Sequence, residues 1–219
     1  DPGVPYGFWR SVGASVQGWV VEAFIDELAG NARKDPYQFR RDMLGKAPRH
    51  RAVLDLVAEK SGWGKPLPAG HARGIAMMEA FGSIIGQVAE VSVSNGNVKI
   101  HKLWCAVDTG WVINPDTIKA QMEGGTIYGL TAALKGEITI ENGRVQQRHF
   151  LDYQMIRHND APEVEVHIVP STETPGGIGE PSTAIAAAAL VNAIAAATGK
   201  RIYKLPIRPG CGSRRVSSR

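Results

Sequence analysis

The sequence predicts an α+β fold in which mixed sheets pack with helices. Three observations support this prediction. Periodic apolar residues mark helices in the first 65 residues, Ile- and Val-rich runs with turn signals follow from residue 74, and an Ala-rich helix lies near the end. With 219 residues, of which 43% are hydrophobic, the chain can bury a substantial core.

The first third of the sequence predicts three helices. Residues 15–28 place apolar side chains at three- and four-residue steps, with Glu22, Asp26 and Glu27 between them, which indicates an amphipathic helix. Asp35-Pro36 opens a second helix, and a third covers about residues 49–60, before Gly62. The Gly- and Pro-containing stretch 64–70 then breaks regular structure. It divides a helical segment, residues 1–65, from an α+β segment, residues 66–206.

Extended structure is predicted after this break. Runs 74–80, 83–93 and 98–108 are rich in Ile and Val, and Asn95-Gly96 is a strong hairpin signal. A helix over 117–133 and strands over 134–140, 144–150 and 163–169 follow. The Ala-rich segment 182–198 is apolar nearly all round, which predicts a buried helix. Residues 207–219 are expected to form a mobile tail.

Composition and charge exclude several classes of function. The net charge of +4 is mild, and its basic residues form no stripe interleaved with aromatics, so nucleic acid is not an expected partner. Cys105 and Cys211 are far apart, and the six histidines lack a ligand spacing, so neither a disulfide framework nor a metal site built from this chain is expected. No apolar run is judged to reach the roughly 18 residues of a membrane span.

The stretch most suggestive of chemistry is Thr174-Pro175-Gly176-Gly177-Ile178-Gly179-Glu180-Pro181-Ser182-Thr183. Its glycines let backbone amides approach a ligand, and they lead to one carboxylate at the start of a helix, where unpaired N–H groups favour anions. The simpler interpretation is that Glu180 is a first-turn residue favoured by the helix dipole, with Ser182 or Thr183 as cap. Spacing alone does not name a reaction.

This stretch resembles the Gly-x-Gly-Glu-Pro signature of molybdenum hydroxylase large subunits, the family of xanthine dehydrogenase, aldehyde oxidoreductases and isoquinoline 1-oxidoreductase. Further motifs agree in order: Gly-Phe-Trp-Arg-Ser-Val-Gly at 7–13, residues 24–29, Cys-Ala-Val-Asp-Thr-Gly at 105–110, residues 112–116 and residues 121–130. The resemblance runs from about Val4 to Pro206. It is strongest to the isoquinoline 1-oxidoreductase beta subunit.

The resemblance implies a molybdenum–molybdopterin cofactor, in bacterial members commonly the cytosine dinucleotide form, held by its pterin dithiolene and needing no protein metal ligand. It implies hydroxylation of an N-heteroaromatic compound, or oxidation of an aldehyde, with water as the oxygen source and Glu180 as the catalytic base. Electrons would leave through the [2Fe–2S] clusters of a small partner subunit, with a cytochrome as a candidate acceptor.

Other residues take roles from the same resemblance. Arg10 and Val12 are expected in the substrate pocket, although Arg10 could equally bond carbonyls around the Gly13 turn. The aromatic that holds a purine in xanthine dehydrogenase relatives is missing after Arg10, which disfavours a xanthine-like substrate. Gln121 is either a cofactor contact or a helix-surface amide. The expected cofactor-binding residues are Gln121, Gly124, Gly125, Gly177, Ile178 and Gly179.

The glycine-rich and Gln-Gly motifs of the family's N-terminal portion do not occur here. The chain is therefore expected to work only with that portion, whether it is a fragment, a proteolysis product or one chain of a split subunit. The start lacks an initiating Met and a signal-peptide pattern and reads like the middle of a longer protein, so this chain does not decide the compartment. A bacterial cytoplasmic or periplasmic location is expected, soluble or attached through a partner. A non-catalytic assembly or binding module, and a cofactor-free hydrolase using Glu180, remain as alternatives.

Overall fold

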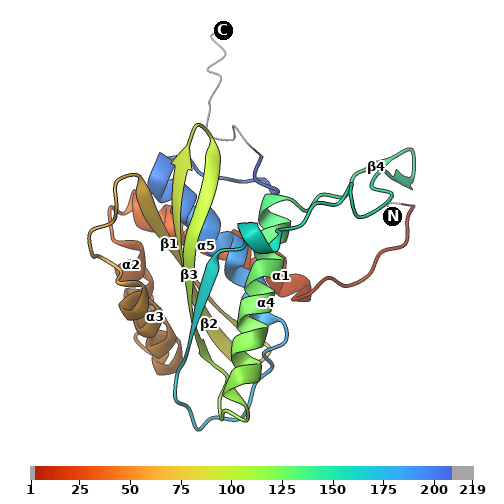
Figure 1. The fold of residues 1–219 in the computed structure, drawn as a ribbon. Helices are drawn as coiled ribbons and strands as arrows, with labels where there is room; N and C mark the ends of the chain where they lie inside the picture. The colour runs from red at the N-terminus through yellow and green to blue at the C-terminus, as the bar shows by residue number, and fades with distance from the viewer. Residues whose placement is uncertain (1–2, 209–219) are drawn as a thin grey trace.

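A four-stranded sheet lies at the centre of the computed structural model, which describes residues 3–208 (Figure 1). The strands β1 (His71–Ala80), β2 (Ser83–Ser94) and β3 (Asn97–Asp108) are antiparallel, and β6 (Glu163–Ile168) pairs in parallel with β3. Asn95 and Gly96 take φ values of 52° and 76° in the β2–β3 turn, as the hairpin signal predicts. The strands predicted over residues 74–80, 83–93, 98–108 and 163–169 are thus confirmed as β1, β2, β3 and β6.

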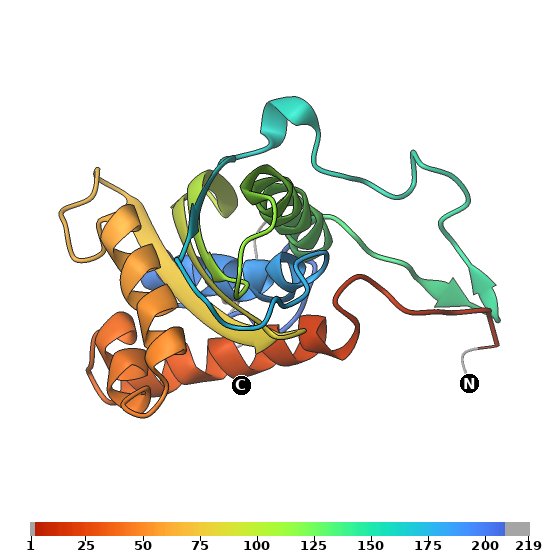
Figure 2. The same ribbon diagram turned by 90° about the horizontal axis from the view of Figure 1, so that it is seen from below.

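Two further predicted strands, 134–140 and 144–150, are wrong. Only β4 (Ile140–Glu141) and β5 (Arg144–Val145) pair, around a turn at Asn142 and Gly143. The rest of this segment forms an arm that projects from the body and reaches the short helix η1 (His158–Asp160) before β6 (Figure 2). Strand propensity needs a surface to pack on, and Ile138, Phe150 and Leu151 on this arm are exposed.

Helices cover both faces of the sheet. The helices α4 (Pro115–Leu134) and α5 (Pro181–Thr198) pack on one face, and α3 (Pro48–Ser61) packs on the other. At Gly74 a Cβ would stand 2.0 Å from the backbone nitrogen of Ala193, so the strand backbone touches that of α5. The middle strand β2 is consequently buried on both sides over most of its length.

The 18-residue α5 is long and apolar enough to cross a membrane by composition, with a mean hydropathy of 1.4. This corrects the expectation that no apolar run is so long. In the structure 83% of that segment is buried, which is typical of the core helix that its all-round apolar character predicts.

The helix α1 (Val12–Asn31) forms where predicted, but its faces are the reverse of the usual amphipathic arrangement. Its buried residues include Glu22 and Asp26, each 5% exposed. Trp19 and Ala23 pack against the core, but five other apolar side chains point outward, with exposed fractions of 40% to 61%: Val16, Val20, Val21, Phe24 and Leu28.

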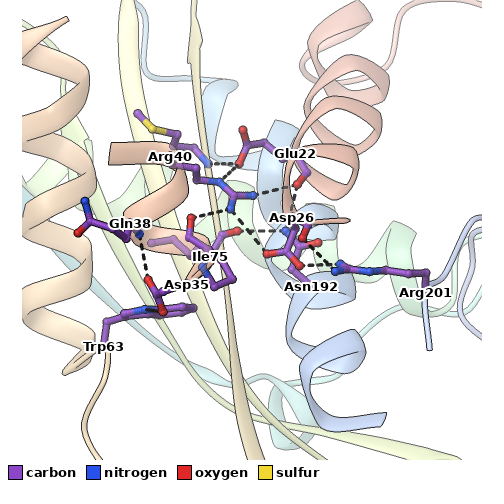
Figure 3. Close-up of polar contacts among 11 residues, drawn as sticks. Glu22, Asp26, Asp35, Gln38, Arg40, Trp63, Ile75, Asn192 and Arg201 are labelled. Carbon is purple, nitrogen blue, oxygen red and sulfur yellow. Dashed lines mark hydrogen bonds and ion pairs between the residues drawn. The ribbon is translucent and has the colours of Figure 1, made fainter. Parts of the chain in front are cut away.

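An arginine from α2 (Pro36–Met43) explains this orientation (Figure 3). Arg40, only 1% exposed, donates from Nε to Glu22 Oε2 at 2.8 Å and approaches Asp26 at 3.6 Å. Arg201 binds the other side of Asp26 at 2.6 Å, and Asn192 of α5 donates to the Glu22 carbonyl. Buried charges are tolerated when they are paired and hydrogen-bonded, as they are here.

The predicted division at residues 64–70 coincides with a loop, but the helices on either side share one body. The α3 side chains form a core with the sheet, while α1 packs along α5. At the start of the predicted tail, Ile207 is buried and donates its N–H to the Ala133 carbonyl. The rest of the tail prediction, 209–219, and Cys211 lie outside the described residues.

Candidate active site

The glycine-containing loop between β6 and α5 rests on two turns of the sheet. Gly176 N–H donates to the Thr109 carbonyl at 2.8 Å, and Gly177 N–H donates to the Phe81 carbonyl at 2.7 Å. A Cβ at position 176 would stand 2.4 Å from the carbonyl oxygen of Gly82. Glycine is therefore needed for this close approach to the β1–β2 turn.

The loop ends at Glu180, immediately before the first residue of α5. Its side chain is half-buried and makes no capping hydrogen bond to its own helix. Its Oε1 accepts the N–H of Ser11 at 3.3 Å. Ser182 and Thr183, the expected caps, donate instead to the α4 carbonyls of Gln121 and Gly125. The capping role expected of Ser182 or Thr183 is therefore not seen. Glu180 stands at the N-cap position of α5, where the helix dipole favours its charge, but its side chain bonds to Ser11 and not to its own helix.

Arg10 joins the N-terminal segment to this loop. Its Nε and Nη2 both donate to the Gly179 carbonyl, and Nη2 also reaches Gln121 Oε1 at 2.8 Å. Its guanidinium lies 5.7 Å from the centre of the Tyr128 ring. Arg10 thus bonds a carbonyl of the Gly179 loop and the side chain of Gln121, and not the carbonyls around the Gly13 turn that its structural alternative predicted. The structure brings these three residues together beside Glu180.

Sequence reasoning missed Ser11, which is fully buried and donates its hydroxyl to the Glu180 carbonyl at 2.6 Å. Ser11 lies four residues before the predicted start of the first helix, and it becomes the N-cap only because α1 begins at Val12. An N-cap signal would in any case point to its own helix and not to a residue 169 positions away. Val12 beside it is 39% exposed, and its place in a substrate pocket stays a prediction.

The six expected cofactor contacts divide into two groups. The Gly177 amide is used by Phe81, which corrects the expectation that it is free for a ligand. Gly125 is buried against α5, where a Cβ would lie 2.0 Å from Ser182 Oγ, so its evident role is helix packing. The other four remain available: Ile178 and Gly179 through their amides, Gln121 through its side-chain NH2 because its Oε1 accepts from Arg10, and Gly124 as an exposed backbone position.

These four available residues form an open strip next to Glu180. Gly124 and Gly179 are exposed, a Cβ at either position would meet no atom within 4 Å, and Gly124 lies one turn after Gln121 on α4. Among residues 3–208 no hydrogen bond is found for the N–H of Ile178 or Gly179. Free amides and a side-chain amide beside a carboxylate fit the polar edge of a pterin nucleotide.

Other reactive groups in the described part of the chain do not form a competing site. Burial raises the pKa of the Cys105 thiol to about 12, so it is not a nucleophile at neutral pH. Residues 3–208 contain no cluster of three His, Cys, Asp or Glu side chains that could hold a metal ion.

A family model described as the molybdopterin cofactor-binding domain matches residues 52–162, just over half of the chain. The chain belongs to this family. The predicted family and fold class are thereby confirmed. The match includes Gln121, Gly124 and Gly125, whereas Arg10 and Glu180 lie outside it.

Known relatives extend the comparison over most of the chain. It is 38% identical to a membrane-bound aldehyde dehydrogenase [pyrroloquinoline-quinone] of Gluconacetobacter polyoxogenes, over 93% of this chain and 29% of that protein. It is 34% identical to the isoquinoline 1-oxidoreductase beta subunit of Brevundimonas diminuta, over 92% of this chain and 26% of that subunit. The chain thus spans less than a third of the length of these relatives.

A solved structure shows the same fold. The aldehyde oxidoreductase from Desulfovibrio gigas matches with a TM-score of 0.73 at 14% identity, over 92% of this chain and 40% of that chain. At this identity the likeness concerns the fold alone.

Proposed function

We propose that this chain is part of the molybdenum subunit of an oxidoreductase that hydroxylates an N-heteroaromatic compound or oxidises an aldehyde, with oxygen derived from water. The observation that carries the proposal is the state of Glu180. This carboxylate begins a buried helix without a side-chain capping bond, and it lies beside an open strip in which the Ile178 and Gly179 amides are unpaired. That is how a base next to a bound cofactor would be held.

Each residue of the strip has a defined task in this proposal. Gln121, Ile178 and Gly179 would hold the cofactor through amide groups, and Arg10 fixes the Gly179 peptide through its carbonyl. When bound, the molybdenum cofactor supplies the two-electron redox chemistry. Glu180 would accept a proton on Oε2, because Oε1 is already bonded to the Ser11 amide.

The relatives' names support the substrate class but disagree about the cofactor. They include isoquinoline 1-oxidoreductase, nicotinate dehydrogenase and aldehyde dehydrogenase, and the last name specifies pyrroloquinoline quinone. The family that matches this chain is defined by molybdopterin, and the unpaired amides beside Glu180 suit a pterin nucleotide. We therefore favour molybdopterin, in its cytosine dinucleotide form.

The partner that completes the site is proposed to be the remaining portion of the molybdenum subunit. Its docking surface would include the outward face of α1, where a hollow of roughly 220 Å³ is lined by Val20, Phe24 and Tyr203 among others. Monomeric proteins seldom leave such apolar rows uncovered, and the relatives' chains contain the additional sequence to cover this one. A small [2Fe–2S] subunit, a cytochrome acceptor and a bacterial cytoplasmic or periplasmic location complete the proposal.

Analysis of the purified native complex that contains this chain tests the function. Molybdenum and a pterin cytosine dinucleotide are expected in about equal amounts to the chain, and turnover is expected with an aliphatic aldehyde, isoquinoline or nicotinate and an artificial electron acceptor. A complex with pyrroloquinoline quinone and no molybdenum would overturn the cofactor. A complex with neither, and no turnover, would favour a non-catalytic binding module.

A further inference from the structure

Ser11 holds both the main chain and the side chain of Glu180. Its amide donates to the carboxylate Oε1 at 3.3 Å, and its hydroxyl donates to the Glu180 carbonyl at 2.6 Å. Among the described residues, the carboxylate accepts no other hydrogen bond, so Ser11 alone orients it there. The residue is fully buried and lies 169 positions earlier in the sequence.

The hydroxyl of Ser11 is not used for the purpose that its position suggests. Ser11 is the N-cap of α1, where a serine side chain normally accepts a hydrogen bond from the second or third amide of the helix. No such bond is present, and the hydroxyl turns to Glu180 instead. The Ser11 side chain therefore does not stabilise the start of α1, and instead binds the loop that precedes α5.

The backbone around Ser11 is strained in the conformation that makes these contacts. Ser11 has φ of 75° and Val12 has φ of 41°, both in the left-handed region, which a β-branched residue such as Val12 very rarely adopts. Strained residues persist where the surroundings hold them, and they gather at functional sites. The Val12 N–H donates to the Trp9 carbonyl at 2.8 Å and closes this turn.

The adjacent residue acts on the same loop. Arg10 binds the Gly179 carbonyl, so Arg10 and Ser11 hold the two peptide groups on either side of Glu180. Arg10 also contacts Gln121, which ties the turn to α4. The segment before α1 therefore holds the end of the loop, at Gly179 and Glu180. The β1–β2 turn holds the preceding part, through the bond from the Gly177 N–H to the Phe81 carbonyl.

We propose that Ser11 is a positioning residue for the reaction: it fixes the Glu180 backbone and ties up Oε1, so that Oε2 is presented to the substrate side. This inference rests on the proposed role of Glu180 as the base. The Ser11 hydroxyl itself exchanges no proton with substrate.

Kinetics of the complete enzyme test this role, using the aldehyde or heterocycle that supports the fastest turnover. Ser11→Gly removes the hydroxyl while relieving the left-handed strain, and Ser11→Ala removes it while retaining the strain. Both are expected to lower kcat about 10- to 100-fold with KM and molybdenum content unchanged, because a small misplacement of a reacting group costs that much. Ser15→Ala is the matched control. The Ser15 hydroxyl donates to the Val12 carbonyl at 2.7 Å and does not touch Glu180, so its removal should leave kcat unchanged.

The Glu180→Gln background separates positioning from a general structural effect. With the base removed, Ser11→Ala should cause no further loss of kcat, since residues that act as a unit are not additive. An equal loss in both backgrounds, or a normal kcat in Ser11→Gly, would overturn the positioning role. If Glu180→Gln itself retains normal turnover, the proposed function fails instead, whatever the Ser11 variants do.

Discussion

Replacing Arg40 with methionine tests the inverted packing of α1. The substitution keeps most of the side-chain volume but leaves Glu22 and Asp26 facing a buried position without their shared cation. Breaking a buried ion pair by removing one partner costs about 3–5 kcal/mol. For a chain of this size that corresponds to a fall in Tm of about 6–20 °C.

The neighbouring Arg41 provides a matched control. It pairs with Asp55 at 2.9 Å, but its side chain is 31% exposed. Surface pairs contribute little, so Arg41→Met should change Tm far less than Arg40→Met in the same thermal melts followed by circular dichroism. Equal effects of the two substitutions would refute the buried network as the reason for the orientation of α1.

The pH dependence of the Arg40→Met effect adds a second test. Burial raises the pKa of the Glu22 carboxyl above its usual 4.5, although Arg40 opposes this rise. The folded protein therefore holds that proton more tightly than the unfolded chain, and the free energy of unfolding falls as the pH rises from about 4.5 through the folded-state pKa. Without Arg40 that pKa is higher still. Arg40→Met should thus be less damaging at about pH 5 than at about pH 8, and a pH-independent loss would contradict this account.

Three further predictions concern packing, acid stability and assembly. Gly74→Ala places a Cβ 2.0 Å from the α5 backbone and should lower stability by about 1–3 kcal/mol in urea melts, whereas Gly45→Ala, with no atom within 4 Å, should be neutral. Burial raises the pKa of Asp108, but arginine and backbone N–H bonds outweigh it and hold the pKa below the usual 3.8. The ionised Asp108 therefore stabilises the fold above about pH 4, and this stabilisation is lost as the pH falls through the folded-state pKa. In Asp108→Asn the free energy of unfolding should accordingly fall less steeply between neutral and acid pH than in the native protein. Phe24→Asp on the outward face of α1 should reduce copurification of this chain with the rest of the subunit, while Met43→Asp, equally exposed on α2, should not.

Much of the fold follows from local sequence signals. Pro36 at the start of α2, the left-handed Gly62 at the end of α3 and Asn95-Gly96 between β2 and β3 each act within a few residues, so the sequence alone predicts these boundaries. The all-round apolar α5 predicts its own burial for the same reason.

The features that escaped prediction depend on distant residues. The burial of Glu22 is decided by Arg40, 18 positions away, so the apolar row of α1 misleads any estimate of its inner face. Residues 134–150 have the composition of strands, yet no sheet edge within the described chain pairs with them beyond β4 and β5. Ser11 reaches Glu180 across nearly the whole sequence, and no spacing rule connects them.

The most direct test of the central claim is the turnover of the complete enzyme carrying Glu180→Gln, compared with the native enzyme at matched molybdenum content. Glutamine keeps the size of the side chain and can still accept the Ser11 N–H, but it cannot take up a proton at neutral pH. We expect kcat to fall by at least about 1,000-fold with the cofactor retained, which is the loss of a base from the chemical step. A variant that keeps both its molybdenum and a near-native kcat would contradict the account of Glu180 as the catalytic base.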